Sequence, residues 1–248
     1  MNRYLKIVVL MACMLTGHAK VMVWDIINYP ENVESVVISG NVNILMDGKS
    51  SRNIVKYKPK YVQVTIKDKV MTISSTAEGS ADVSIRLFAA KGLENVQKMT
   101  INDNVNLTAR GLIGPHEIEI NTSGRVMLEG YLSAPKITQN GDANTEVLWL
   151  SGTSAAITLN SGYMKIAGNL KKSYVSLANA AHLDAKHLRI DNLWLSTKDQ
   201  ADVSVYPSKE LHVTSLDEST VRSVYKPSTT SQYSDSTATV VFQSIFSS

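Results

Sequence analysis

The sequence predicts an all-β protein whose larger part is a single-stranded β-helix, or β-solenoid, with rungs of about 19 residues. Three observations predict this fold. Apolar residues recur at a nearly fixed spacing, each recurrence lies in a short stretch of alternating apolar and polar residues, and turns rich in Asn and Gly follow. An N-terminal region with an antiparallel hairpin is expected before the solenoid.

The repeat runs from residue 99 to residue 224, with gaps of 18 to 20 residues between equivalent positions. The reference positions, all but one apolar, are Ile101, Ile120, Gln139, Leu159, Leu177, Leu195 and Val213. A second apolar residue lies two positions earlier in each rung: Met99, Ile118, Ile137, Ile157, Val175, Leu193 and Leu211. Because side chains alternate along a strand, both series should point inward.

The residues between these two series should point outward and form a ladder along the surface. That ladder reads Thr100, Glu119, Thr138, Thr158, Ser176, Trp194 and His212. The interior is then aliphatic except for Gln139, and a buried amide needs hydrogen-bond partners. We expect those partners to be turn asparagines of adjacent rungs.

Turn asparagines recur with the same spacing. Asn102, Asn121, Asn140 and Asn160 are separated by 19, 19 and 20 residues, and Asn179 continues the series with a shift of one position. We expect these side chains to stack as a structural amide ladder. A row of asparagines that binds a ligand is the alternative.

The first 19 residues predict export. A short basic segment at residues 2–6 precedes an apolar run at residues 7–15, and Gly17, His18 and Ala19 favour cleavage by a signal peptidase. Alternatively, residues 10–13 resemble a lipobox, which would place a lipid on Cys13 and provide the only membrane contact. Either route predicts a periplasmic, cell-surface or secreted protein of a bacterial envelope.

After the leader, residues 21–27 are predicted to form a first strand. Residues 36–46 read as two strands joined at Gly40 and Asn41 and closed by a turn at Asp47 and Gly48. A basic stretch at residues 49–61 follows, in which a solvated hairpin face is favoured over contact with acidic glycans or lipid headgroups. Further on, residues 83–87 read as a strand and residues 93–96 as a link into the repeats.

The clearest hairpin covers residues 62–74. Val62, Val64 and Ile66 alternate with polar residues, Asp68 lies in the turn, and Val70 begins the returning strand. With the link at 93–96 and the rungs that follow, this order resembles the head GIN domain of putative auto-transporter adhesins. The resemblance extends over roughly residues 33–225. It implies an exported bacterial β-helical domain with a role in adhesion or binding, and it supplies no catalytic residues.

The domain boundaries follow from these segments: a leader at 1–19, a β-helical GIN-like domain at 20–227 and a tail at 228–248. The tail begins with a Ser/Thr-rich stretch that predicts a flexible connection, and residues 240–246 should fold back as a capping strand. A segment that recognises a partner is the alternative.

Neither the composition nor the sequence motifs indicate nucleic-acid binding, metal binding or catalysis. The formal charge of +3 becomes nearly neutral without the leader, which argues against nucleic acid as a partner. His116, His182, His187 and His212 lack metal-ligand spacing, so we expect no metal, no cofactor and no catalytic residue. A polysaccharide-acting enzyme would need carboxylates stacked on neighbouring rungs, whereas Lys165 beside Asp184 predicts an ordinary ion pair.

Binding is therefore the favoured function. The aromatic residues Tyr57, Tyr61, Trp149 and Trp194 are candidates for contacting a glycan or surface ligand along the solenoid flank, because sugars stack on flat rings. The competing interpretation is that these rings cover loops and corners. A second function class is a structural or assembly component of the envelope, whose partner protein binds the tail or an open strand edge.

Overall fold

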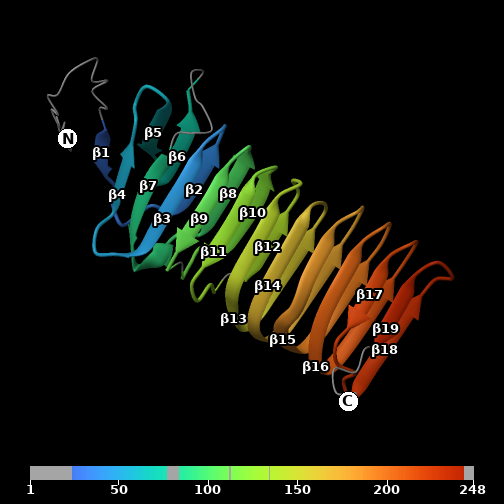
Figure 1. The fold of residues 1–248 in the computed structure, drawn as a ribbon. Helices are drawn as coiled ribbons and strands as arrows, with labels where there is room; N and C mark the ends of the chain where they lie inside the picture. The colour runs from blue at the N-terminus through green and yellow to red at the C-terminus, as the bar shows by residue number, and fades with distance from the viewer. Residues whose placement is uncertain (1–23, 77–83, 112, 134, 243–248) are drawn as a thin grey trace, which may run out of the picture.

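The structure is a computed structural model that describes residues 24–76, 84–111, 113–133 and 135–242. It confirms the all-β solenoid with an N-terminal antiparallel region. Figure 1 shows the rungs stacked along one axis, with β1 at one end and β18 and β19 at the other. In the described part of the chain, no helix is long and apolar enough to cross a membrane.

The strands lengthen toward the middle of the solenoid. The N-terminal strands are β1 (Asp25–Asn28), β2 (Ser35–Ser39), β3 (Asn43–Ser50), β4 (Ile54–Tyr57), β5 (Val62–Lys67), β6 (Val70–Ser75) and β7 (Ser84–Ala90), followed by the 3₁₀ turn η1 (Lys91–Leu93). The next strands are β8 (Lys98–Asp103), β9 (Asn106–Arg110), β10 (Glu117–Thr122), β11 (Arg125–Glu129) and β12 (Lys136–Gln139). The remainder are β13 (Asn144–Leu159), β14 (Tyr163–Leu177), β15 (His182–Thr197), β16 (Asp202–Ser215), β17 (Thr220–Ser223), β18 (Thr229–Ser234) and β19 (Thr239–Phe242).

Two parallel sheets make up the solenoid. Sheet A contains β6, β2, β8, β10 and β12, the C-terminal halves of β13 to β16, and β18. Sheet B contains β7, β3, β9 and β11, the N-terminal halves of β13 to β16, and then β17 and β19. The long strands β13 to β16 bend from one sheet into the other, so they belong to both.

The first rungs do not stack in chain order. Strand β2 lies between β6 and β8, and β3 lies between β7 and β9, so the first rung is enclosed by two later ones. The chain reverses direction to reach the outer rung: β4 runs antiparallel to β7, and the predicted hairpin forms as β5 with β6. This arrangement covers the N-terminal end of the solenoid with antiparallel strands, which protects the edge from pairing with other chains.

The core is a column of aliphatic side chains between the two sheets, contributed by alternate residues of each strand. The predicted register holds from Ile101 through Leu177 and again from Leu195 to Val213, but the step between Leu177 and Leu195 is wrong. Leu177 pairs with Thr197 rather than Leu195, and Thr197 in turn pairs with Ser215. The rung between Leu177 and Thr197 is thus two residues longer than the apolar pattern suggests. The pattern missed the true inward positions because polar residues, Thr197 and Ser215, occupy them.

Those polar residues satisfy one another inside the core. Thr197, Ser215 and Ser219 are fully buried, and their hydroxyl oxygens lie 2.8 to 3.0 Å apart. The Ser219 hydroxyl also donates to the carbonyl of Leu216 at 2.7 Å. A closed set of hydroxyl hydrogen bonds removes the cost of burying these groups, so the interior tolerates them without aliphatic neighbours.

Gln139 is buried as expected, but its predicted partners are wrong. Its amide nitrogen donates to the carbonyls of Ala143 and Ser161, each at 3.0 Å, and its oxygen accepts from the hydroxyl of Thr145 at 2.7 Å. The turn asparagines are engaged with one another instead, so the amide is satisfied by backbone and a hydroxyl.

Two further segments differ from expectation. Asp47 and Gly48 lie inside β3 and do not form a turn, because β3 stays paired with both β7 and β9 through Asp47. Residues 229–234, expected as a flexible connection, form β18 in parallel register with β16. Alternating Thr, Ser and Tyr side chains suit a strand, and the edge of β16 supplies the backbone partners.

Candidate functional site

An aromatic column stands on the outer surface of sheet A. Tyr174, Trp194 and His212 occupy equivalent outward positions of β14, β15 and β16, since Tyr174 pairs with Trp194 and Trp194 with His212. Ala156 precedes them in β13 and Ser231 follows in β18. The predicted outward ladder placed Ser176 before Trp194; the two-residue longer rung puts Tyr174 there instead.

The rings of this column stack on one another. The ring centroids of Tyr174 and Trp194 are 5.3 Å apart with planes at 30°, and those of Trp194 and His212 are 5.2 Å apart at 12°. Lys172 places its ammonium nitrogen 4.7 Å from the Tyr174 centroid and 4.6 Å from that of Trp194, beside the stack. The inner ring faces are therefore covered, while Tyr174 keeps one face toward the small side chain of Ala156.

A furrow of about 430 Å³ runs beside the aromatic column. Hydroxyl side chains from the neighbouring column line it, and Tyr233, 66% exposed, ends it at β18. These hydroxyl residues occupy equivalent positions on successive rungs, so that each lies beside the next: Thr158, Ser176, Ser196 and Thr214. We call the lining of this space the aromatic furrow: Ala156, Thr158, Tyr174, Ser176, Trp194, Ser196, His212, Thr214, Ser231 and Tyr233.

The other predicted binding aromatics lie elsewhere. Trp149 is 43% exposed at the corner after sheet B, where its ring meets Tyr131 edge-on at 6.4 Å. Tyr57 is only 6% exposed, so its prediction as a surface-binding residue is wrong: it faces the core from β4, as Val55 does. Burial and the nearby Asp25 raise the pKa of its hydroxyl. Tyr61 is half-buried against the core.

The four turn asparagines lie in register along the edge between the sheets. Asn121 donates its amide to Asn102 at 3.0 Å, Asn140 to Asn121 at 2.9 Å, and Asn160 to Asn140 at 2.7 Å. Asn179 departs from the series and donates to the backbone carbonyl of Asn160. Each of these bonds joins one rung to the next.

Aspartates continue the turn edge beyond Asn179. The backbone N–H of Asn179 donates to the carboxylate of Asp199, that of Asp199 to Asp217, and that of Asp217 to Asp235. These bonds hold the pKa of Asp235 below its usual value, with the N–H of Asp217 as the largest cause. Each of these carboxylates therefore accepts a hydrogen bond from a backbone N–H of the preceding rung.

Surface ion pairs also differ from the predicted one. Lys165 lies 3.5 Å from Glu146 rather than pairing with Asp184, whose carboxylate lies 3.2 Å from Lys186. On sheet A, the Lys98 ammonium lies 2.6 Å from the Glu119 carboxylate. Hydrogen bonds from Lys98 and Asn121 lower the pKa of Glu119, while the bond to Glu119 raises that of Lys98.

The four histidines do not gather in one place: His116 precedes β10, His182 and His187 both lie on β15, and His212 lies on β16. His182 stacks on Tyr163 and lies 3.3 Å from Asp202, which also pairs with Arg222; His212 belongs to the aromatic column. In the residues that the structure describes, no three His, Cys, Asp or Glu side chains gather as a metal site. Cys13, the candidate lipidation residue, lies outside the described residues.

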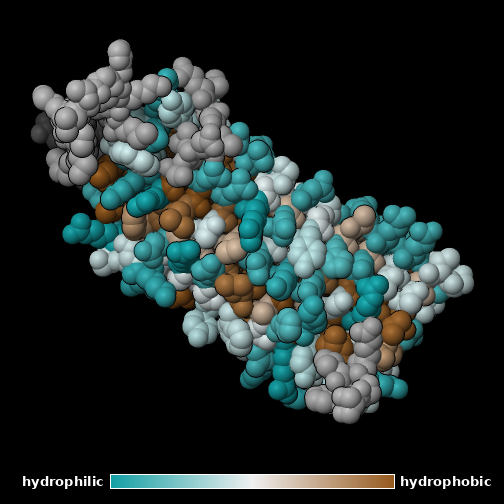
Figure 2. Space-filling view, in the orientation of Figure 1, coloured by the Kyte–Doolittle hydropathy of each residue, from teal (hydrophilic) through white to brown (hydrophobic). Residues whose placement is uncertain are grey.

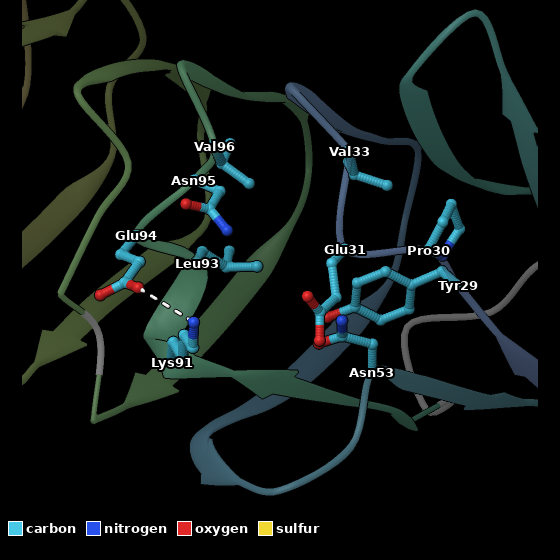
Figure 3. Close-up of a pocket in the computed structure, with 10 residues that line it drawn as sticks. All are labelled: Tyr29, Pro30, Glu31, Val33, Asn53, Lys91, Leu93, Glu94, Asn95 and Val96. Carbon is cyan, nitrogen blue, oxygen red and sulfur yellow. Dashed lines mark ion pairs between the residues drawn. The ribbon is translucent and has the colours of Figure 1, made fainter.

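A small cavity near the N-terminal end offers little space for a ligand. Figure 3 shows Tyr29 and Asn53 on one side of it and the Lys91–Glu94 ion pair, at 3.8 Å, on the other. The cavity measures about 30 Å³, which is the scale of a single water molecule. The Tyr29 hydroxyl donates to the carbonyl of Phe88 at 3.0 Å, and burial raises its pKa.

Comparison with known families matches residues 60–227 to the family described as "Putative auto-transporter adhesin, head GIN domain". The chain belongs to this head GIN domain family. The match begins just before the hairpin of β5 and β6 and ends after β17, so it covers more than half of the chain. The first rung, β2 and β3, precedes the matched residues although it is enclosed within the same solenoid.

Solved structures share this GIN fold at low sequence identity. A putative adhesin from Parabacteroides merdae has a TM-score of 0.74 at 16% identity, over 89% of this chain and 95% of its own. A putative adhesin from Parabacteroides distasonis has a TM-score of 0.68 at 16% identity, over 88% and 96%. A protein from the same species described as a putative lipid binding protein has a TM-score of 0.67 at 12% identity, over 88% and 96%. No curated protein matches the sequence.

Proposed function

We propose that this GIN-family chain is an exported, non-catalytic, adhesin-like module that binds a linear glycan in the aromatic furrow of sheet A. The observation that carries the proposal is the furrow of about 430 Å³ with stacked rings on one side and a hydroxyl column on the other. Export to the bacterial envelope is part of the proposal, supported by the family and by the predicted leader at residues 1–19.

The furrow suits the two-sided chemistry of a sugar. A pyranose presents C–H groups that pack on aromatic rings and hydroxyls that exchange hydrogen bonds with Ser and Thr. The free face of Tyr174, next to Ala156, offers a stacking platform at one end, and the ring edges of Trp194 and His212 continue along the furrow. Because the rungs repeat along the axis, a chain of repeating sugars can meet equivalent groups at successive positions.

The composition of the furrow favours binding over hydrolysis. Its described lining consists of aromatic, aliphatic and hydroxyl residues together with His212, whereas glycoside hydrolysis ordinarily uses a pair of carboxyl groups across the scissile bond. Of the two acidic residues nearest in sequence to the column, Asp191 pairs with Lys209 at 2.8 Å, which leaves Glu210, 3.9 Å from His212, as a single carboxylate beside the furrow. These contacts support the non-catalytic assignment.

A glycan array on the purified full-length chain tests the proposal, with release of reducing ends measured on the same polysaccharides. We expect retention without turnover. Tyr174→Ala and Trp194→Ala should each weaken retention about tenfold, because aromatic anchors carry much of the energy of such contacts. Trp149→Ala is the matched control, since it removes an exposed Trp outside the furrow. Equal retention by all three variants, or turnover, contradicts the proposal.

The second candidate function is an assembly component of the envelope whose partner protein pairs with an open strand edge. The observation that favours it is that β18 and β19, within residues 24–242, have strand partners on one side only, and every residue of β18 is exposed. Such an edge can accept a strand from another protein.

Deletion of residues 228–248 tests this second candidate. Loss of partner capture in a crosslinked pull-down, with a monomeric and folded variant, would support it. Aggregation without loss of capture would instead identify β18 and β19 as a cap over β16 and β17, because their removal exposes the next edge.

A further inference from the structure

Exposed apolar side chains gather at a second place, away from the aromatic furrow. Nine large hydrophobic residues are exposed in the described part of the chain, and five of them lie on the N-terminal half of sheet B or at the corners that follow its strands. These five are Leu45, Ile113, Tyr131, Leu148 and Trp149, with exposures of 39% to 74%. In Figure 2 brown atoms gather over the region that Figure 1 labels β3 and β11.

Strand register places Leu45 and several cations on one face, the groove described below adds Ile113 and Tyr131, and Trp149 lies against Tyr131. Across β4, β7 and β3, Lys56 pairs with Arg86 and Arg86 with Leu45. In the next outward column, Phe88 pairs with Asp47, Asp47 with Arg110, and Arg110 with Glu129. We call this face the apolar-basic surface: Leu45, Asp47, Lys49, Lys56, Arg86, Phe88, Arg110, Ile113, Glu129, Tyr131, Leu148 and Trp149.

The centre of the apolar-basic surface is hollowed. A groove of about 500 Å³ is lined by Leu45, Ile113 and Tyr131, together with Lys49 and Arg110. Tyr131 is 74% exposed and its only described ring neighbour is the edge-on Trp149, so much of its ring faces solvent. Large contiguous apolar surfaces of this kind mark contact with another protein or with a membrane.

The charges on the surface are unbalanced. Four cations face two carboxylates, which leaves an excess of two positive charges. The carboxylate of Asp47 accepts the backbone N–H of Lys49, and that of Glu129 lies 3.5 Å from Arg110. Lys56 places its ammonium 5.4 Å from the Phe88 ring and remains half-exposed. Basic and aromatic side chains beside exposed aliphatic ones are the composition of a membrane-interface contact.

We propose that the apolar-basic surface binds an anionic lipid bilayer, independently of the aromatic furrow. Leu45, Ile113 and Leu148 enter the interfacial region, the rings of Tyr131 and Trp149 lie at headgroup level, and Arg86 and Arg110 meet lipid phosphates. Net positive charge complements such a bilayer, whereas pairing two copies of this face would bring like charges together.

The path of the chain agrees with this placement. Strand β1 pairs with β4, where Ile26 lies opposite Lys56, and Trp24 lies 5.3 Å from the ammonium of Lys58. The chain therefore enters the described structure at the border of the apolar-basic surface. A membrane tether on the preceding residues would hold this surface, rather than the aromatic furrow, next to the bilayer.

Vesicle flotation of the full chain tests the proposal, with phosphatidylcholine vesicles and with phosphatidylcholine vesicles that contain phosphatidylglycerol. We expect binding to the anionic vesicles only, and weaker binding as salt increases, because screening acts on exposed charges. Tyr131→Ala with Trp149→Ala, and separately Arg86→Gln with Arg110→Gln, should each reduce binding about tenfold. Circular dichroism checks that both double variants remain folded.

Tyr174→Ala with Trp194→Ala is the matched control, because it removes two aromatic rings from the other sheet. This control should bind anionic vesicles like the wild type. Equal binding to both vesicle types, equal loss in the control, or no vesicle binding at all would overturn the proposal. A concentration-dependent dimer in light scattering that only the Tyr131 and Trp149 variant loses would assign the surface to a second copy and would also overturn it.

Discussion

At the scale of single residues, ion pairs and amides connect one rung to the next on the outer surface. Glu119 on β10 accepts hydrogen bonds from Lys98 at 2.6 Å on the neighbouring strand and from Asn121 at 3.1 Å on its own strand. The pKa of the Glu119 carboxyl is lowered chiefly by the bond from Lys98. A carboxyl whose pKa is lower in the folded state stabilises the fold above its unfolded pKa, and this contribution disappears as the pH falls through the folded value.

Replacement Glu119→Gln should therefore remove part of the acid sensitivity of the fold. Urea unfolding of the wild type should lose stability below about pH 4, the usual range of a glutamate, and the variant should lose less over the same interval. Because the pair is partly exposed to solvent, the difference should stay below about 1 kcal/mol. Parallel pH profiles for both proteins would contradict this assignment.

At the scale of elements, the turns supply hydrogen bonds between rungs that add to those of the strands. The amide series from Asn102 to Asn160 joins four successive turns, and Asn140 takes part in two of its bonds. Strand pairing alone fixes the distance between rungs, whereas the turn amides also fix how the ends of the rungs align.

Replacement Asn140→Ala removes the bonds to Asn121 and Asn160 together. The expected loss is about 1 to 2 kcal/mol of unfolding free energy, since each net hydrogen bond contributes about 0.5 to 1.5 kcal/mol. Chemical denaturation measures it. Asn169→Ala, an exposed asparagine of β14 away from the turn, is the matched control and should change stability little. Equal losses in the two variants would show that the amide series adds nothing.

At the scale of the whole molecule, the solenoid separates two chemically different surfaces. Sheet A carries the aromatic furrow in its C-terminal half, and sheet B carries the apolar-basic surface in its N-terminal half. A module arranged this way can contact a bilayer with one face while the other stays open to a glycan. The two proposals therefore predict different losses. Removal of the Trp194 ring should weaken glycan binding but not vesicle binding, and removal of the Trp149 ring together with that of Tyr131 should weaken vesicle binding.

The fold was predictable because its dominant signals are local. Inward apolar residues such as Ile101 and Ile120 and turn residues such as Asn121 repeat along the chain, and both the solenoid and the family resemblance follow from them. The placement of β2 between β6 and β8 was not predictable from this period, because it depends on pairing between segments that do not follow one another.

The candidate site was only partly predictable, because the strand pairing that brings its residues together does not follow from the repeat period alone. Trp194 stands out in the sequence, but Tyr174 joins it through a rung that is two residues longer, where the buried hydroxyls of Thr197 and Ser215 replace aliphatic residues. Tyr57 shows the converse: its position in a basic stretch suggests exposure, yet the alternation of β4 directs it into the core.

The central claim, that the aromatic furrow binds a linear glycan, is tested most directly by calorimetric titration of an array-positive polysaccharide into three proteins. The wild type and Trp149→Ala should bind with equal affinity, and Trp194→Ala should bind about tenfold more weakly, with no reducing ends released in any sample. Equal affinity of all three proteins, or a loss confined to Trp149→Ala, would contradict the claim.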